Sequence, residues 1–227
     1  MNRKIYSNLA RYIEHTFGHA VTNNPEVLKQ IVDHLDDKIL STYFGWDQTQ
    51  GKEGGYWTQQ INFKNRNTGQ ALVDRITTGT KKKILDVGCG DNEFKKFFGK
   101  QLTGIDPFND RADIKVSLEN YIAPEEYDIV FALGSINFGD EDTIADQVKK
   151  IVSFCKPGGM IVIRANPGIT HDHPKAEWID FFEWSEEYIN KFAEQNKCNV
   201  EVIGWDHPSE ETIRWGNRYY SIWHKHE

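Results

Sequence analysis

The chain has 227 residues, of which 38% are apolar and 13% aromatic, and its 27 basic and 34 acidic residues give a formal net charge of −7. This length suits one well-packed domain with additions and is too short for two large domains. The acidic balance argues against a general affinity for nucleic acid or anionic lipid.

Cysteine usage and hydropathy narrow the class of protein further. The three cysteines, Cys89, Cys155 and Cys198, lie far apart, a spacing that suggests neither a disulfide framework nor a zinc site. No run approaches the roughly 20 apolar residues that a bilayer span needs. We therefore expect a cytoplasmic protein with no membrane partner and no export signal, and nothing in the sequence indicates its oligomeric state.

The first 60 residues are expected to form a helical segment and a lid loop. After "TNNP" the apolar residues recur at helical spacing, with Asn24 as the cap and Pro25 as the first helical residue. Residues 44–57, "FGWDQTQGKEGGYW", hold four glycines and show no period. This composition predicts a loop, which would cover a bound substrate.

From residue 83 onward, strand and helix patterns alternate. A short helix around residues 71–76 comes first, and a helix at 144–152 stops at "KPGG". A further helix, "SEEYINKFAEQN", begins at Ser185 as its cap. The expected strands are 84–87, 102–106, 114–116, 127–133, 160–164, "CNVEVIG" and "RYYSIWHK". Alternation at this spacing predicts an α/β, doubly wound sheet that binds ligands at the carboxyl ends of its strands.

A glycine turn stands between the first of these strands and a helix. Gly88 and Gly90 let the backbone approach a ligand closely, which is typical of a nucleotide-binding loop. A dinucleotide fingerprint requires a further glycine three residues after Gly90, where this chain has Glu93.

Four segments, in this order, resemble motifs of the class I S-adenosylmethionine-dependent methyltransferases: "ILDVGCG", "GID", "YDIVFALGSINF" and "KPGGMIVIR". The resemblance covers roughly residues 70–225 and implies a methyltransferase domain over 61–227, capped by the N-terminal helices. It implies a Rossmann-like, mostly parallel seven-stranded sheet with helices on both faces and the last strand antiparallel. One departure is Asn92, which stands at the family's third glycine. Asparagine tolerates positive φ, and we expect it also to help cap the helix at Glu93.

The resemblance assigns S-adenosylmethionine as the cofactor and gives roles to the two aspartates. Asp86 would receive the amino group, loop amides at Gly88 and Gly90 would face the methionine part, and Asp106 would accept both ribose hydroxyls. The alternative is that both aspartates cap backbone turns. The adenine would stack on Pro107 and Phe108, with Ser117, Leu118 or Glu119 at its edge. The expected cofactor-binding residues are Asp86, Gly88, Cys89, Gly90, Asp106, Pro107, Phe108, Leu118, Leu133 and Gly134.

Three residues are candidates for the acceptor side. Asn137 follows the fourth-strand motif and could orient a substrate or close the turn. His171 and His173 could take a proton from the acceptor, because histidine titrates near neutrality, or could lie on a polar surface loop. A His-x-His pair can begin a metal site, but no third ligand has fitting spacing, so we expect no metal. Together with Tyr56 and Trp57, these residues are expected to line one pocket.

The chain lacks the proline pair before an aromatic, and the Pro–Cys nucleophile, of nucleic-acid methyltransferases. We therefore expect methyl transfer to O or N of a small molecule. Two other functions remain open: a nicotinamide-dependent oxidoreductase, against which Glu93 counts, and a cofactor-binding regulatory module without turnover.

Overall fold

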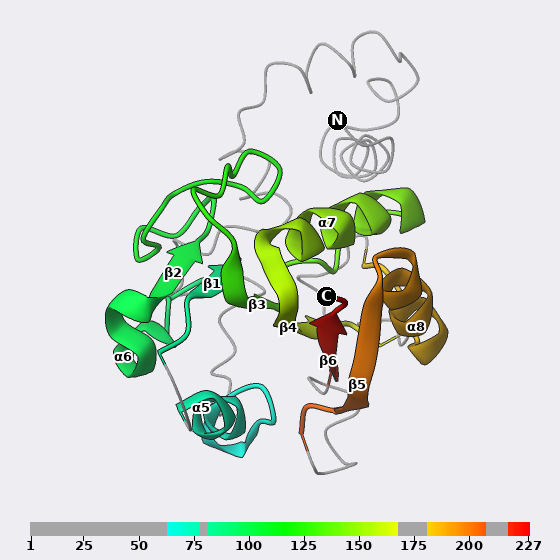
Figure 1. Ribbon diagram of the computed structural model, residues 1–227, viewed down its shortest axis with the longest axis horizontal. Coiled ribbons are helices and arrows are strands. Elements are labelled where there is room, and N and C mark those ends of the chain that lie inside the picture. The colour runs from blue at the N-terminus through cyan, green and yellow to red at the C-terminus, as the bar shows by residue number, and fades with distance from the viewer. Residues whose placement is uncertain (1–62, 78–80, 168–180, 208–217) are drawn as a thin grey trace, which may run out of the picture.

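The computed structural model describes residues 63–77, 81–167, 181–207 and 218–227. The expected N-terminal helical segment and lid loop lie outside these residues. The described chain forms an α/β fold around a six-stranded sheet with strand order β2-β1-β3-β4-β6-β5 (Figure 1). The strands are β1 (Ile84–Val87), β2 (Leu102–Ile105), β3 (Tyr127–Leu133), β4 (Cys155–Ala165), β5 (Cys198–Trp205) and β6 (Tyr219–Lys225).

The central pairs β1·β2, β1·β3 and β3·β4 are parallel, and β6 is antiparallel to both β4 and β5. The prediction that the last strand is antiparallel is therefore confirmed. β4 begins at Cys155, five residues earlier than predicted, because "KPGG" is taken into the strand and Tyr127 pairs with Cys155.

The expected strand at residues 114–116 is wrong. Ile114 forms only an isolated bridge to Ile105. The segment does lie parallel to the end of β2, because the Ile114 N–H donates to the Gly104 carbonyl and the Asp106 N–H donates to the Ile114 carbonyl. The pairing is too short to form a strand. The described sheet consequently has six strands where seven were predicted.

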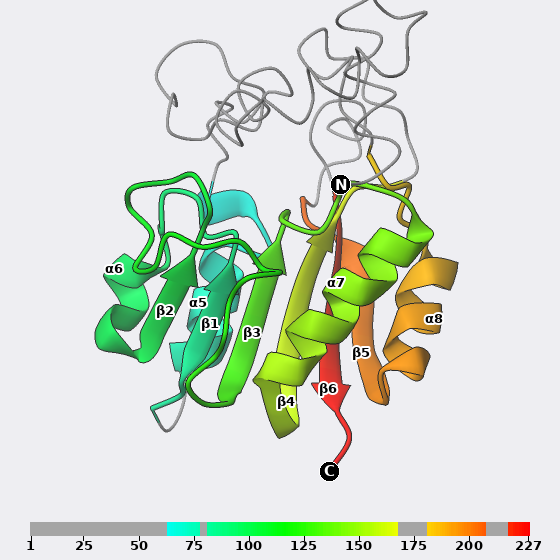
Figure 2. The ribbon, with the colours of Figure 1, turned by 90° about the horizontal axis from the view of Figure 1, so that it is seen from above.

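Helices cover both faces of the sheet, as Figure 2 shows. On one face lie α5 (Gln70–Thr77) and α6 (Lys95–Phe98), where Leu72, Phe94 and Phe98 pack on β-strand residues such as Phe131. On the other face lie α7 (Glu141–Phe154) and α8 (Glu186–Gln195). Two 3₁₀ turns, η2 (Phe63–Asn65) and η3 (Gly99–Gln101), complete the described helices.

The two longer helices begin at side-chain caps. Asp140 accepts a hydrogen bond from the Thr143 N–H at α7, and Ser185 accepts one from the Tyr188 N–H at α8, as predicted for Ser185. No helix in the described ranges is long and apolar enough to span a bilayer.

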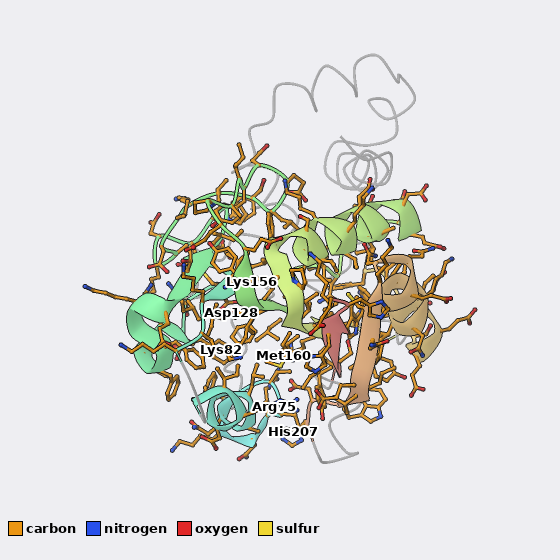
Figure 3. The ribbon with its side chains drawn as sticks, viewed as in Figure 1. Arg75, Lys82, Asp128, Lys156, Met160 and His207 are labelled. Carbon is orange, nitrogen blue, oxygen red and sulfur yellow. The ribbon has the colours of Figure 1, made fainter. Side chains whose placement is uncertain are left out.

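An ion pair joins the starts of β3 and β4, at the edge opposite the strands' carboxyl ends. Lys156 Nζ lies 2.9 Å from a carboxylate oxygen of Asp128, and the two side chains point toward each other (Figure 3). Asp128 also accepts the backbone N–H of Lys83, just before β1. Asp128 thus connects the starts of β1, β3 and β4.

Candidate cofactor and acceptor site

One edge of the sheet gathers the carboxyl ends of all the strands except β6. Because β1 to β4 are parallel and β6 is antiparallel to both neighbours, β5 runs in the same direction as β4. The residues that follow these strands share that edge: Gly88, Asp106, Gly134, Asn166 and Asp206. Ligands of open α/β sheets bind at such an edge.

The glycine turn after β1 is packed directly against the loop after β3. Gly88 has φ +69°, and a Cβ atom added there would lie 2.4 Å from the Cβ of Ser135. Any side chain at position 88 would therefore collide with that loop. Gly90 has φ +51° and Asn92 φ +54°, so the turn has three residues in the left-handed region.

Asn92 adopts the positive φ that the sequence predicts, but the prediction that its side chain caps the following helix is wrong. Its side-chain N–H donates to the carbonyl of Arg111 at 3.0 Å and reaches Asp113 at 3.4 Å. The residue preceding α6 is Phe94, with no side-chain cap. The amide of Asn92 therefore joins the turn to the chain after β2, while its buried Oδ1 has no hydrogen-bond partner among the residues that the structure describes.

We predict that Asn92→Ala is less stable to urea than Asn92→Gly by about 1 kcal/mol. Both variants lose the bond to Arg111, but only alanine must hold a Cβ at positive φ. At an ordinary position the order is the reverse, because glycine loses more backbone entropy on folding. An alanine variant as stable as the glycine variant would show that position 92 does not keep this conformation in solution.

The loop amides are used within the protein, contrary to the expectation that those of Gly88 and Gly90 face a ligand. The N–H groups of Gly88 and Cys89 both donate to the carbonyl of Ile105 at the end of β2. The Gly90 N–H donates to Asp106 Oδ2 at 3.1 Å. The turn is closed onto β2 because the parallel pairing of β1 and β2 continues into it.

Asp106 is buried and organises the loop after β2. Its Oδ1 accepts the backbone N–H groups of Phe108 and Asn109, both at 2.9 Å, and its Oδ2 accepts that of Gly90. Asp106 therefore caps backbone turns, which was the alternative to a ligand-binding role in the sequence analysis. A carboxylate has about four lone-pair positions, so Oδ2 keeps one acceptor position for a ligand hydroxyl.

Asp86 differs from Asp106 in lacking a partner. It is 4% exposed and makes no hydrogen bond or ion pair with any of the described residues. Burial, and then the nearby charge of Asp106, raise the pKa of Asp86 to about 7. A buried carboxyl group without a partner is costly once it ionises, so this position favours a cationic ligand group.

The other expected cofactor residues are distributed around this edge. Cys89 is half-buried, and burial and the carboxylates nearby raise the pKa of its thiol. A Cβ atom added at Gly104 would lie 2.9 Å from its Sγ. Pro107 and Phe108 are half-buried in the loop after β2, Leu118 is buried in the core, and Leu133 and Gly134 are half-buried at the end of β3.

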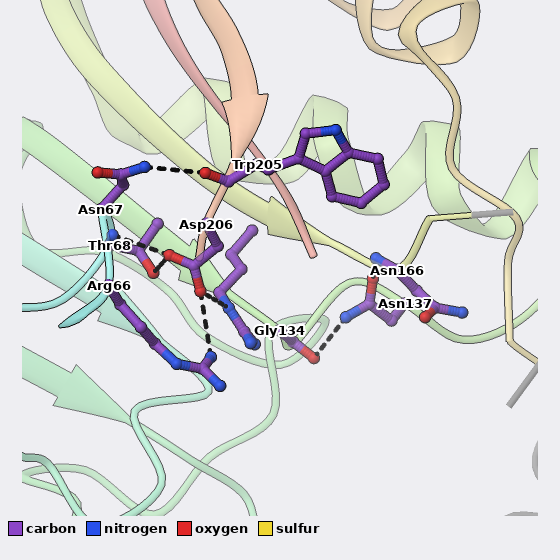
Figure 4. A network of polar contacts seen from close by, with 9 residues as sticks. Arg66, Asn67, Thr68, Gly134, Asn137, Asn166, Trp205 and Asp206 are labelled. Carbon is purple, nitrogen blue, oxygen red and sulfur yellow. Dashed lines mark hydrogen bonds and ion pairs between the residues drawn. The ribbon is translucent and has the colours of Figure 1, made fainter. Parts of the chain in front are cut away.

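Asn137 has a structural role in the loop after β3. Its Nδ2 donates to the Gly134 carbonyl at 3.1 Å (Figure 4), and its Oδ1 accepts the Asn166 N–H at 2.7 Å. The side chain is 3% exposed, and these bonds match the turn-closing alternative. His171, His173, Tyr56 and Trp57 lie outside the described residues, so their predicted place in the pocket stays a prediction.

A buried ionic network that the sequence analysis missed lies beside this loop. Asp206 is 1% exposed, and its Oδ2 accepts a hydrogen bond from Arg164 Nε at 2.6 Å. The same oxygen accepts one from Arg66 Nη1 at 3.1 Å (Figure 4). Its Oδ1 accepts both the N–H and the hydroxyl of Thr68. The available signal was Arg164 itself, an arginine within the apolar strand "MIVIRA".

The network connects three separate parts of the chain. It joins the segment before α5 to the ends of β4 and β5, and the Asn67 side chain adds a bond to the Trp205 carbonyl. Burial alone would raise the pKa of Asp206, but the arginines and Thr68 outweigh it and hold the pKa below its ordinary value. Burial, and then Arg164, lower the pKa of Arg66 to about 10.

No protein-family model matches this sequence, and no curated protein sequence matches it. Solved structures do match the fold. An N-methyltransferase, NodS, from Bradyrhizobium japonicum WM9 in complex with S-adenosylhomocysteine aligns with a TM-score of 0.61 at 13% identity, over 82% of this chain and 99% of that one.

Two further structures have the same fold. The 1,6-didemethyltoxoflavin-N1-methyltransferase of Burkholderia thailandensis aligns with a TM-score of 0.60 at 14% identity, over 90% of this chain and 91% of that one. Magnesium protoporphyrin IX methyltransferase from Synechocystis PCC 6803 aligns with a TM-score of 0.56 at 16% identity, over 84% and 98%. The fold is thus that of the class I S-adenosylmethionine-dependent methyltransferases.

Proposed function

We propose that this protein is an S-adenosylmethionine-dependent methyltransferase that transfers a methyl group to O or N of a small molecule. The observation that carries the proposal is Asp86, a buried carboxyl group with no partner among the described residues at the carboxyl edge of the sheet. The ammonium of an amino-acid ligand would supply the missing charge and hydrogen bonds. The similarity of fold supports the same function.

The chain's own groups fit the other parts of this cofactor. Asp106 Oδ2 retains an acceptor position for a ribose hydroxyl, and Pro107 and Phe108 follow it as apolar neighbours for the adenine. Gly88, with no room for a side chain, lets the loop after β3 pack directly against the turn at the edge where the cofactor would bind. When bound, the cofactor supplies a methyl group on a sulfonium, an electrophile that needs no metal to react.

The role of the protein in the reaction would be alignment. Gly88 and Ser135 hold the loops after β1 and β3 in contact, and the Asn137 side chain fixes the loop after β3 to Asn166. A nucleophile held against those loops would meet the methyl group in line, which removes much of the entropic barrier. His171 and His173 remain candidates for accepting the acceptor's proton.

Titration calorimetry tests the cofactor. We expect S-adenosylhomocysteine to bind and NAD to give no heat, because Glu93 replaces the last glycine of a dinucleotide loop and Asp86 suits a cationic group. Binding of NAD without S-adenosylhomocysteine would contradict the proposal and favour the oxidoreductase.

A turnover assay separates the enzyme from a regulatory module. The protein with S-adenosylmethionine and a panel of small O- and N-nucleophiles should release S-adenosylhomocysteine with at least one acceptor. Tight cofactor binding with no acceptor-dependent release across the panel would favour the module without turnover.

A further inference from the structure

The Arg66–Asp206–Arg164 network has more positive than negative charge. Two arginines share one carboxylate, and both are largely buried, with side chains 14% and 11% exposed. The carboxylate has no capacity left, because Thr68 already gives two hydrogen bonds to its other oxygen. One buried cationic charge therefore lacks a counter-charge in this network, in a protein whose net charge is −7.

The arginines also keep unused N–H donors. Arg164 gives Asp206 only its Nε–H, and Arg66 gives only an N–H of Nη1. Within the described residues, Nη1 and Nη2 of Arg164 have no hydrogen-bond acceptor, although neither nitrogen is sealed from solvent. A planar guanidinium with both terminal nitrogens available matches the geometry of a carboxylate or phosphate.

One of the unused donors, Nη1 of Arg164, lies against the loop after β3. Arg164 pairs with Leu133 across β3 and β4, so its backbone lies beside the start of this loop. Gly134 has no side chain. A Cβ atom added to it would lie at a point 3.8 Å from Arg164 Nη1 and 3.9 Å from Asn137 Nδ2. The described neighbours of this point are therefore two N–H donor groups, and no carboxylate is among them.

This position is close to the proposed cofactor site but separate from it. Ser135, the next residue, packs against Gly88 of the glycine turn. Arg164 stems from β4, two strands away from Asp86 on β1, which is about 10 Å at the usual strand spacing. An amino acid's ammonium and carboxylate are bonded to one carbon, so a cofactor held by its ammonium at Asp86 keeps its carboxylate near β1.

We propose that Arg164, with the excess positive charge that it shares with Arg66, binds an anionic group, a carboxylate or phosphate, on the methyl acceptor. The acceptor is thus an anionic small molecule whose charged group lies over Gly134 while its nucleophile faces the methyl group. This inference rests on the proposed function, since it assigns the anion to the acceptor. The anion site itself rests only on the arginines and the loop after β3.

The test is a phosphate titration followed by nuclear magnetic resonance, in the presence of saturating S-adenosylhomocysteine and at constant ionic strength kept with chloride. We expect saturable shifts of the Gly134 backbone amide and the Asn137 side-chain amide in the wild-type protein. Arg164→Gln should weaken phosphate binding at least about tenfold. The control Arg75→Gln removes an exposed arginine already paired with Glu201 and should bind as the wild type does.

Several results would overturn the inference. Shifts that do not saturate, shifts confined to other residues, or equal binding by wild type and Arg164→Gln would remove the anion site. Because the wild-type titration stands alone, it decides the matter even if Arg164→Gln does not fold. If Arg164→Gln loses S-adenosylhomocysteine but keeps methylthioadenosine, which lacks the amino-acid part, the arginines hold the cofactor's carboxylate and the acceptor assignment is wrong.

The proposed function fails separately. If the wild-type protein does not bind S-adenosylhomocysteine, the methyltransferase proposal falls, and with it the assignment of the anion to an acceptor. The same phosphate titration of the free protein then still decides whether Arg164 and Gly134 form an anion site.

Discussion

Asp86→Asn is expected to stabilise the free protein at pH 8 by about 2–4 kcal/mol while weakening S-adenosylhomocysteine binding about 10- to 100-fold. The two effects have one origin. A buried carboxyl group without a partner is unfavourable when ionised, and the same charge is what a bound ammonium would pair with. Urea unfolding and titration calorimetry measure the two quantities.

The pH dependence has a defined direction. The pKa of Asp86 is raised in the folded state from 3.8 to about 7, so the unfolded chain ionises first as pH rises. Wild-type stability is therefore lost between those two values, and the asparagine variant, which cannot ionise, keeps it. At pH 4 the two proteins should differ by less than about 1 kcal/mol, since Asp86 is protonated in the folded state.

Glu93→Gln is the matched control, because it removes the same charge from the turn that follows the strand of Asp86. Glu93 is half exposed and pairs with Lys96, so its loss should change stability by less than about 1 kcal/mol. If Asp86→Asn destabilised the protein at pH 8, the carboxylate would have a partner in solution. Unchanged S-adenosylhomocysteine affinity would remove Asp86 from the proposed site.

Asp206→Asn is expected to have the largest effect on stability, a loss of about 3–5 kcal/mol at pH 7. The substitution keeps the side-chain volume but leaves Arg66 and Arg164 buried without a counter-charge. It also weakens the bonds from Thr68 that join the segment before α5 to the end of β5. Thermal and urea unfolding at several pH values measure the loss.

The same network makes the stability of the folded protein depend on pH in the acidic range. The pKa of Asp206 lies below its ordinary value, so its stabilisation is complete above the unfolded pKa and is lost as pH falls through the folded one. The asparagine variant should lack this part of the acid-induced loss.

Glu201→Gln is the control. Glu201 lies in β5, the strand that Asp206 follows, but its side chain is 38% exposed and pairs with Arg75 and His224. Its loss should cost less than about 1 kcal/mol. An equally small effect for Asp206→Asn would mean that the arginines find another partner or water, and that the network holds little excess charge.

Local pattern was enough to predict most of the fold. The strands 127–133 and 84–87 were predicted with their observed bounds, because continuous apolar runs flanked by turn residues are typical of buried parallel strands. Two further predictions also depended only on nearby residues and are confirmed: Ser185 caps the start of α8, and Asn92 adopts positive φ. The segment at 114–116 was mispredicted because three residues of β-type sequence do not reveal how far a pairing extends, and here it is limited to one bridge at the end of β2.

The sequence by itself determined the strand and helix order, the sharp turn at Gly88 and Gly90, and the presence of Asp86 and Asp106 at strand ends, since each depends on neighbours within a few residues. Only the tertiary structure decided which groups remain available. Asp106 is engaged by backbone N–H groups of two loops, Asp86 is left without a partner in the described chain, and Asp206 gathers two arginines from distant segments. Hydrogen-bond partners and burial come from chain segments far apart in sequence, which no local pattern contains.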